Sequence, residues 1–108
     1  MKTEMKHTQE KWIRDGKFIY ALIQDGWDKG KPQMVNKFWL SVDGHKNITA
    51  EEIEANAKLI AAAPELLEIS MDLWKVLQQE LPYMPPERKP VIKEFMGYAE
   101  RTIRKAIE

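Results

Sequence analysis

The sequence predicts a small α+β domain, in which a three-stranded antiparallel sheet is followed by a helical hairpin whose first helix is kinked at a proline. Three observations predict it: short apolar runs separated by Gly-rich turns over residues 10–44, and apolar residues at helical spacing over 49–81 and again over 87–107. Residues 1–9 are polar and charged and are predicted to form a flexible tail. Residues 10–108 are therefore predicted to form one domain.

The first two strands are predicted from a tight turn. Residues 11–14 and 17–23 flank the pair Asp15 and Gly16. An Asp-Gly pair suits a hairpin turn because glycine adopts positive φ without steric cost. The two strands are therefore expected to be antiparallel.

The third strand is predicted over residues 34–42, after a turn-rich connection over 25–32 that contains Gly26, Gly30 and Pro32 as breakers. Side chains alternate between the two faces of a strand. The residues expected under the helix are Phe38, Leu40 and Val42. The same alternation places Trp39 on the outer face of the sheet.

Residues 18–23 are apolar at every position, which indicates a strand covered on both faces. A single helical hairpin covers one face only. We expect a second copy of the chain to cover the other, so the sequence predicts a homo-oligomer. Three of its tryptophans, Trp12, Trp27 and Trp39, fall in or near this region.

The first helix begins with a predicted capping box, in which the Thr49 hydroxyl accepts from the Glu52 amide and the Glu52 carboxylate reaches back. Pro64 removes a helical hydrogen bond, so we expect a kink near Ala61 or two abutting helices. Two apolar flanks predict that the helix is covered on two sides. The first comprises Ile53, Ile60, Leu67, Met71 and Trp74, and the second Leu59, Ala63, Leu66, Leu73 and Leu77.

A proline-rich loop precedes the second helix, and Pro90 suits its first turn. Its apolar residues recur at helical spacing and predict antiparallel packing on the first helix; they are Val91, Ile92, Phe95, Met96, Ala99, Ile103 and Ile107. Its other face is basic, with Lys93, Arg101, Arg104 and Lys105. These cations either pair with the acidic flank of the first helix or point jointly at an anion.

Composition restricts the setting. The chain has no cysteine, which excludes disulfides and thiolate metal sites, and no apolar run approaches the ~20 residues of a membrane span. The formal charge is zero overall, with +3 over residues 1–48, −5 over 49–82 and +2 over 83–108. The sequence has no large excess of basic residues of the kind that binds duplex DNA, so we do not expect nucleic acid as a partner. We expect a soluble protein of the bacterial host's cytoplasm with no membrane association.

The run ANAKLIAAAPELL, residues 55–67, resembles a helix found in many small phage and prophage accessory proteins, usually behind a short tryptophan-containing β segment. The resemblance implies a phage origin. The plan of a β segment followed by a helical hairpin is also similar to the phage anti-Thoeris sponges. That likeness implies sequestration of a signal of the cyclic ADP-ribose type.

Catalytic patterns are few. The two histidines, His7 and His45, fall in the expected tail and in a turn, and neither has a partner at metal-ligand spacing. Residues 25–32 lack the ligand set of a calcium loop and the Lys-Ser/Thr of a phosphate loop. We predict no enzyme, no metal site and no cofactor.

Three functional hypotheses follow. The first is a counter-defence protein that sequesters a nucleotide-derived immune signal between chains. The residues expected to contact the ligand are Trp39 and Trp12 by stacking, Arg101 and Arg104 through phosphates, and Asn56 through a polar contact. The alternative is a protein inhibitor that docks on a host defence enzyme or nuclease. The third, a nucleic-acid accessory protein, fits the balanced charge least well.

Overall fold

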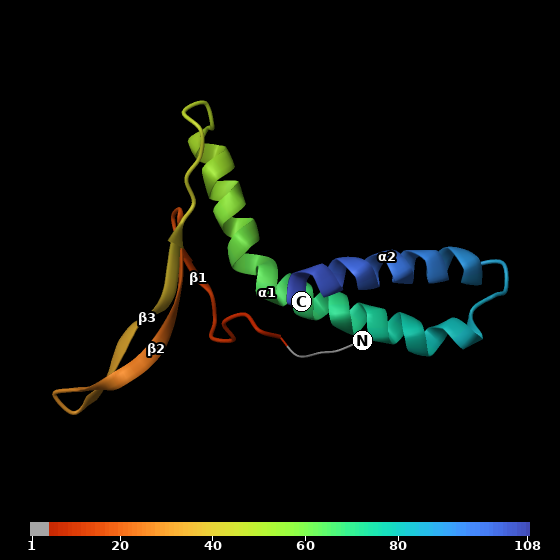
Figure 1. Cartoon of the computed structure of the whole chain (residues 1–108), viewed down its shortest axis with the longest axis horizontal. Helices are drawn as coiled ribbons and strands as arrows, with labels where there is room; N and C mark the ends of the chain where they lie inside the picture. The colour runs from red at the N-terminus through yellow and green to blue at the C-terminus, as the bar shows by residue number, and fades with distance from the viewer. Residues whose placement is uncertain (1–4) are drawn as a thin grey trace. The chain divides into compact units, whose positions relative to one another are not determined.

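The structure, a computed structural model, describes residues 5–108 (Figure 1). Its elements are β1 (Ile13–Asp15), β2 (Phe18–Asp28), β3 (Lys31–Ser41), α1 (Ala50–Glu80), the short 3-10 helix η1 (Leu81–Tyr83) and α2 (Lys89–Ile107). The sheet is antiparallel in the order β1-β2-β3, and the two helices follow it, so the predicted α+β fold is confirmed. The described residues form two compact units, a sheet unit over 8–64 and a hairpin unit over 5–7 and 65–108.

β1 is shorter than the predicted strand over residues 11–14, and because Asp15 pairs with Phe18, the first turn consists of Gly16 and Lys17 and not of Asp15 and Gly16. β2 and β3 extend further toward each other than predicted, and the predicted connection over residues 25–32 is wrong. β2 continues to Asp28, which pairs with Lys31 of β3. Only Lys29 and Gly30 form the turn, with φ values of 51° and 77°. Positive φ at both central residues is the geometry of a type I′ hairpin turn, which matches the twist of the flanking strands.

Two apparent strand breakers are accommodated within the hairpin. Gly26 has a φ of 78° and lies where the register shifts between Gln24 and Trp27. A bulge of this kind needs a residue that adopts positive φ, and glycine does so without steric cost. Pro32 belongs to β3, an edge strand, and lies opposite Trp27 of β2. Its missing N–H therefore costs no hydrogen bond within the sheet.

The core of the sheet unit lies between the sheet and the first half of α1. Its buried members are Ile19, Val42 and Ala57, and the side chains packed against them are Trp12, Phe38, Leu40, Ile53, Ile60 and Ala61. Residues of β2 and β3 that share one face of the pleat therefore meet the helix. This confirms that Phe38, Leu40 and Val42 point toward α1.

α1 begins at the predicted cap and runs through its proline. The Glu52 amide donates a hydrogen bond to Thr49 Oγ1 at 3.1 Å, which is the N-cap half of the predicted capping box. The helix is continuous from Ala50 to Glu80 with Pro64 inside it, so the alternative of two abutting helices is wrong. The boundary between the two units follows Pro64, where the helix loses one backbone hydrogen bond.

The hairpin unit has a separate core between α1 and α2. Met71, Ile103 and Ile107 are buried there, with Met5, Leu67 and Trp74 packed against them. The Trp74 indole Nε1 donates a hydrogen bond to the Met96 carbonyl at 3.0 Å, which ties the two antiparallel helices together. Of the tail expected over residues 1–9, the first four lie outside the described residues.

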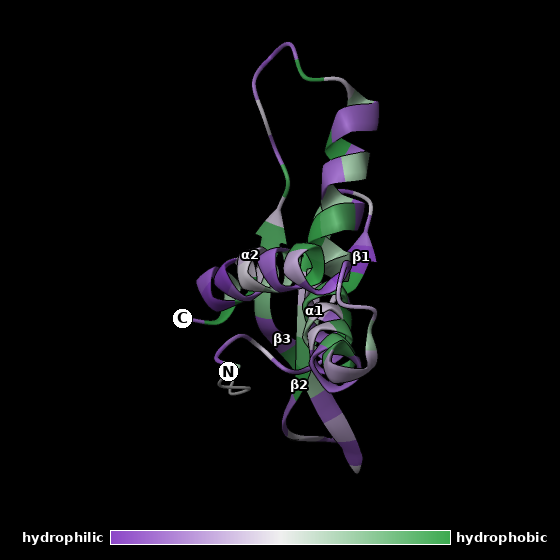
Figure 2. Cartoon of the chain, turned by 90° about the vertical axis from the view of Figure 1, so that its right-hand side faces the viewer, coloured by the Kyte–Doolittle hydropathy of each residue, from purple (hydrophilic) through white to green (hydrophobic). Residues whose placement is uncertain are grey.

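The prediction that α1 is covered on two sides is wrong for the single chain. Its first apolar flank forms both cores, but Leu59, Leu66 and Leu73 of the second flank are 63%, 47% and 58% exposed. Figure 2 shows apolar residues alternating with polar ones along both helices. The second apolar flank is therefore an exposed surface of the chain.

Candidate binding surface

The outer face of the sheet carries a cluster of apolar side chains, which we call the outer-face cluster: Ile13, Phe18, Tyr20, Leu22 and Trp39. Tyr20 is paired with Ile13 of β1 on one side and with Trp39 of β3 on the other. Their neighbours Ile19 and Ala21 point into the core, so Tyr20 and Leu22 point outward.

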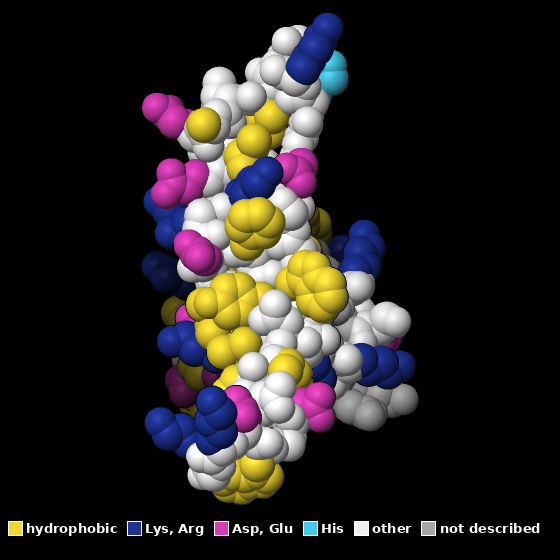
Figure 3. All heavy atoms as spheres, turned by 90° about the vertical axis from the view of Figure 1, so that its left-hand side faces the viewer, with side chains coloured by type: hydrophobic (Ala, Val, Ile, Leu, Met, Phe, Trp, Pro, Cys, Tyr) yellow, Lys and Arg dark blue, Asp and Glu magenta, His cyan; other side chains and the backbone are white. Residues whose placement is uncertain are grey.

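Trp39 is the most exposed member of this cluster, with 70% of its surface accessible, and Phe18 is 49% exposed. The predicted outward position of Trp39 is thus confirmed. The prediction that residues 18–23 are covered on both faces is wrong within one chain, because α1 covers the inner face alone. Figure 3 shows hydrophobic side chains gathered over this face with charged groups around them.

Two ion pairs lie at the margins of the sheet. Lys17 Nζ donates to Asp43 Oδ1 at 2.8 Å, and Lys37 Nζ donates to Glu10 Oε1 at 2.6 Å. The hydrogen bond from Lys37 lowers the pKa of the Glu10 carboxyl, and the hydrogen bonds from Lys17 and then Ser41 lower that of Asp43. Each pair joins a lysine to a carboxylate, so charged groups lie at the margins of the sheet.

These pairs predict a pH effect. A carboxyl whose pKa is lowered by folding stabilises the protein above its unfolded-state pKa, and the contribution disappears as pH falls through its folded-state pKa. The pH range in which this stabilisation is lost therefore lies at and below the ordinary pKa values, 4.5 for Glu10 and 3.8 for Asp43. We expect the Glu10→Gln, Asp43→Asn double variant to melt slightly below wild type at neutral pH and level with it at about pH 2.5. Thermal melts across this range check it, and a pH-independent difference would contradict it.

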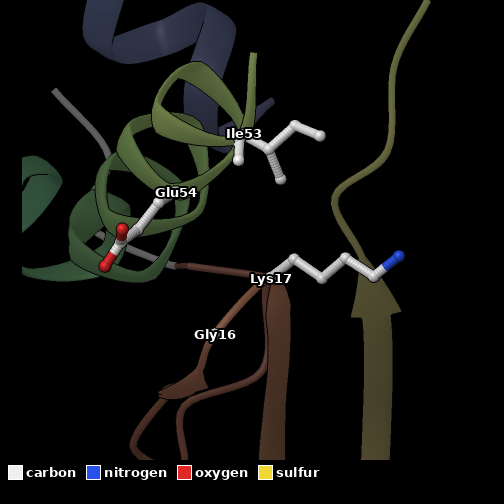
Figure 4. Close-up of a pocket in the computed structure, with 5 residues that line it drawn as sticks. Gly16, Lys17, Ile53 and Glu54 are labelled. Carbon is white, nitrogen blue, oxygen red and sulfur yellow. The ribbon is translucent and has the colours of Figure 1, made fainter. Parts of the chain in front are cut away.

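A shallow cavity of about 400 Å³ opens between α1 and the β1–β2 turn, lined by Gly16, Lys17, Ala50, Ile53 and Glu54. Its two charged side chains come from different elements and point away from each other (Figure 4). Glu54 lies 3.9 Å from Arg14 and 3.6 Å from Lys58, whereas Lys17 pairs with Asp43. The cavity thus brings together no nucleophile and base, and none of the predicted site residues lines it.

A second depression, of about 340 Å³, lies on the surface of α2 and is lined by Val91, Glu94, Phe95, Tyr98 and Arg101. We call it the α2 groove. A Cβ built on Gly97 would lie 3.6 Å from an Arg101 guanidinium nitrogen, so that side chain folds back over Gly97. The groove therefore combines two aromatic rings with one guanidinium and one carboxylate.

The two predicted stacking residues are separated by the sheet. Trp12 lies against the inner core, its ring edge-on to Phe38 at 5.0 Å between centroids, and its Nε1 donates to the Thr8 carbonyl at 3.1 Å. Trp39 points from the opposite face. A ligand stacked on Trp39 is therefore out of reach of Trp12 in the same chain.

The other predicted contacts are also dispersed. Asn56 is exposed on α1 in the sheet unit, whereas Arg101 and Arg104 belong to the hairpin unit. Arg104 forms an intrahelical ion pair with Glu100 at 2.9 Å. Of the five predicted residues, Arg101 lines the α2 groove, and none lines the cavity between α1 and the β1–β2 turn.

Tyr20, Phe95 and Tyr98 were not among the predicted ligand contacts. Tyr20 could have been found from its register, because a residue paired with an outward Trp39 also points outward. Phe95 was assigned to the helix–helix contact, but it is 56% exposed and lies beside Tyr98 instead. Helical spacing alone does not say which of two apolar flanks meets the neighbouring helix.

Residues 5–108 contain no group of three or more His, Cys, Asp or Glu side chains that could hold a metal ion. Over the same range, no helix has both the length and the apolar character needed to cross a membrane.

A family model described as Salmonella phage P22 protein Y8K6 matches residues 1–108. No curated protein and no solved structure matches the chain. The match spans both units, and the predicted phage origin is confirmed by it.

Proposed function

The chain belongs to the family of Salmonella phage P22 protein Y8K6, and from this premise we propose that it is a counter-defence protein that binds and blocks a host defence protein without chemistry. The outer-face cluster carries this proposal. Trp39, Tyr20 and Phe18 present aromatic surface at the centre of a face with charged margins. Protein interfaces have this anatomy, with aromatic anchors inside a polar rim.

The open form of this surface favours a protein partner over a small molecule. Small-molecule sites are concave and enclose most of their ligand, whereas the outer-face cluster projects from a sheet. The backbone that carries its side chains is held in place by the strand pairing, so little backbone order has to be gained on binding.

The first experiment is a rescue assay. Bacterial strains that each carry one defence system are infected with a phage that the system blocks, with and without the chain expressed. We expect plating to recover on at least one strain, and the purified chain to form a stoichiometric complex with a protein of that system. Failure to rescue any strain, or rescue without such a complex, would contradict the proposal.

A second candidate function, sequestration of a nucleotide-derived signal, is favoured by the α2 groove. Phe95 and Tyr98 offer rings on which a base can stack, and Arg101 offers a guanidinium that can hold a phosphate. This candidate keeps Arg101 from the predicted site and replaces the tryptophans by the aromatic residues of α2.

The test of this candidate is a calorimetric titration with cyclic dinucleotides, cyclic ADP-ribose and linear nucleotides. We expect Arg101→Gln to weaken binding by roughly 10-fold or more, since it removes a charge-assisted hydrogen bond. Arg104→Gln is the matched control, on the same helix but paired with Glu100. Equal losses of affinity in both variants would indicate that the ligand is attracted only by the positive charge of α2 and not bound in the groove. No binding of any of these nucleotides at micromolar concentration would exclude sequestration.

A further inference from the structure

The segment before β1 is shared between the two units of the chain. Residues 5–7 belong to the hairpin unit, and residues 8–12 belong to the sheet unit. Within the described residues, the chain passes from one unit to the other at two points, between His7 and Thr8 and after Pro64 inside α1. We call residues 5–12 the strap.

One end of the strap is held in the hairpin unit. The Met5 side chain packs against the buried cluster of that unit, formed by Met71, Ile103 and Ile107. An apolar side chain leaves such a cluster only with the loss of the free energy gained by its burial. Met5 is therefore an anchor and not part of a loose tail.

The other end of the strap is held in the sheet unit. The Trp12 ring packs in the core of that unit, edge-on to Phe38, and its Nε1 donates a hydrogen bond to the Thr8 carbonyl at 3.1 Å. The Glu10 carboxylate accepts a hydrogen bond from Lys37 Nζ of β3 at 2.6 Å. Thr8, Glu10 and Trp12 are thus tied to the sheet.

The second connection between the units, α1, is weakest at Pro64. A proline inside a helix has no N–H to donate to the carbonyl four residues earlier, and its ring crowds that carbonyl. Among the described core residues, α1 contributes to the sheet unit as far as Ala61 and to the hairpin unit from Leu67 onward. The helix therefore bends most easily between these two residues.

We propose that the strap limits bending of α1 at Pro64 and so restricts the motion of the two units relative to each other. Met5 and Thr8 are three residues apart, and a segment of this length spans at most about 10 Å. Bending beyond this reach pulls Met5 from its cluster or Thr8 from Trp12. The inference is independent of the proposed function. It bears on both candidate surfaces, because the outer-face cluster belongs to the sheet unit and the α2 groove to the hairpin unit.

A distance measurement along α1 in the full chain tests the proposal. Because the chain has no native cysteine, Glu51→Cys and Gln79→Cys introduce two spin labels at exposed positions on either side of Pro64. Along a straight helix these positions are about 42 Å apart, within the range of pulsed electron paramagnetic resonance. We expect a narrow distance distribution for the labelled chain.

Lengthening the strap should release α1. Four glycines inserted between His7 and Thr8 add up to about 13 Å of reach and leave both anchors in place, so the width of the distance distribution should at least roughly double. The matched control is the same insertion between Lys29 and Gly30, at the exposed turn of the β2–β3 hairpin. It should leave the distribution unchanged, and circular dichroism should show equal helix content in both chains.

Two further variants separate the strap from the hinge. Met5→Asp releases the strap without lengthening it, because a buried charge is costly, and it should broaden the distribution as the insertion does. Pro64→Ala, added to the chain with the lengthened strap, restores a helical hydrogen bond and should narrow the distribution again.

Three results would overturn the proposal. The first is a distribution that is already as broad with the native strap as with the lengthened one. The second is equal broadening by the insertion at the β2–β3 turn. The third is a broad distribution that Pro64→Ala does not narrow, which would place the bending elsewhere in α1.

Discussion

Ile19→Ala is expected to lower the free energy of unfolding of the sheet unit by about 2–5 kcal/mol. Ile19 is fully buried and forms the buried core of the sheet unit with Val42, which directly follows β3, and Ala57 of α1. Truncation removes its transfer free energy and leaves a cavity, because the surrounding strands and helix collapse only in part. Since small domains are stable by about 5–15 kcal/mol, this is a large fraction of the total.

Ile23→Ala is the matched control for this prediction. Ile23 is the same residue type, on the same strand, but it is 38% exposed. Its truncation should cost clearly less than that of Ile19, since less buried surface is lost. Urea unfolding followed by circular dichroism measures both, and equal losses would show that the described core does not dominate the stability of this unit.

The successful predictions of the fold all rest on local chemistry. The glycine of the first turn (Gly16), the Thr49 cap and the alternation that places Phe38 inward and Trp39 outward each depend on residues close in sequence. Such signals remain visible in the sequence because tertiary packing does not oppose them.

The errors arose where local chemistry allows two outcomes. Gly26, Gly30 and Pro32 were interpreted as breakers of one long turn, although a bulge, a type I′ turn and an edge position each accommodate one of them inside a hairpin. Likewise, two apolar flanks on α1 indicate two packing partners. The pattern is the same whether the second partner belongs to the same chain or to another molecule.

The predicted site could not be assembled from the sequence for a related reason. Trp12 and Trp39 were grouped by residue type, but the pleat and the entry of the chain into β1 place them on opposite faces. The grouping of Arg101 with Phe95 and Tyr98 depends on the fold of the Arg101 side chain over Gly97. Neither fact is encoded in a spacing rule.

Trp39→Ala is expected to weaken binding to the defence protein by roughly 30-fold or more, the effect of losing a hot-spot side chain worth about 2 kcal/mol. Trp39 has the largest exposed surface in the outer-face cluster and lies beside Tyr20, so a partner on this face buries both rings. Because Trp39 contributes little to the core, the variant should unfold at nearly the wild-type denaturant concentration.

Trp27→Ala separates this effect from the general loss of an exposed tryptophan. Trp27 is 68% exposed against 70% for Trp39, and it lies opposite Pro32 near the end of the same β-hairpin, away from the outer-face cluster. Its truncation should change the affinity by less than about 3-fold. Isothermal titration of the purified complex compares the two variants directly. If Trp27→Ala costs as much as Trp39→Ala, the partner binds along the whole hairpin, and the outer-face cluster is not the centre of the interface.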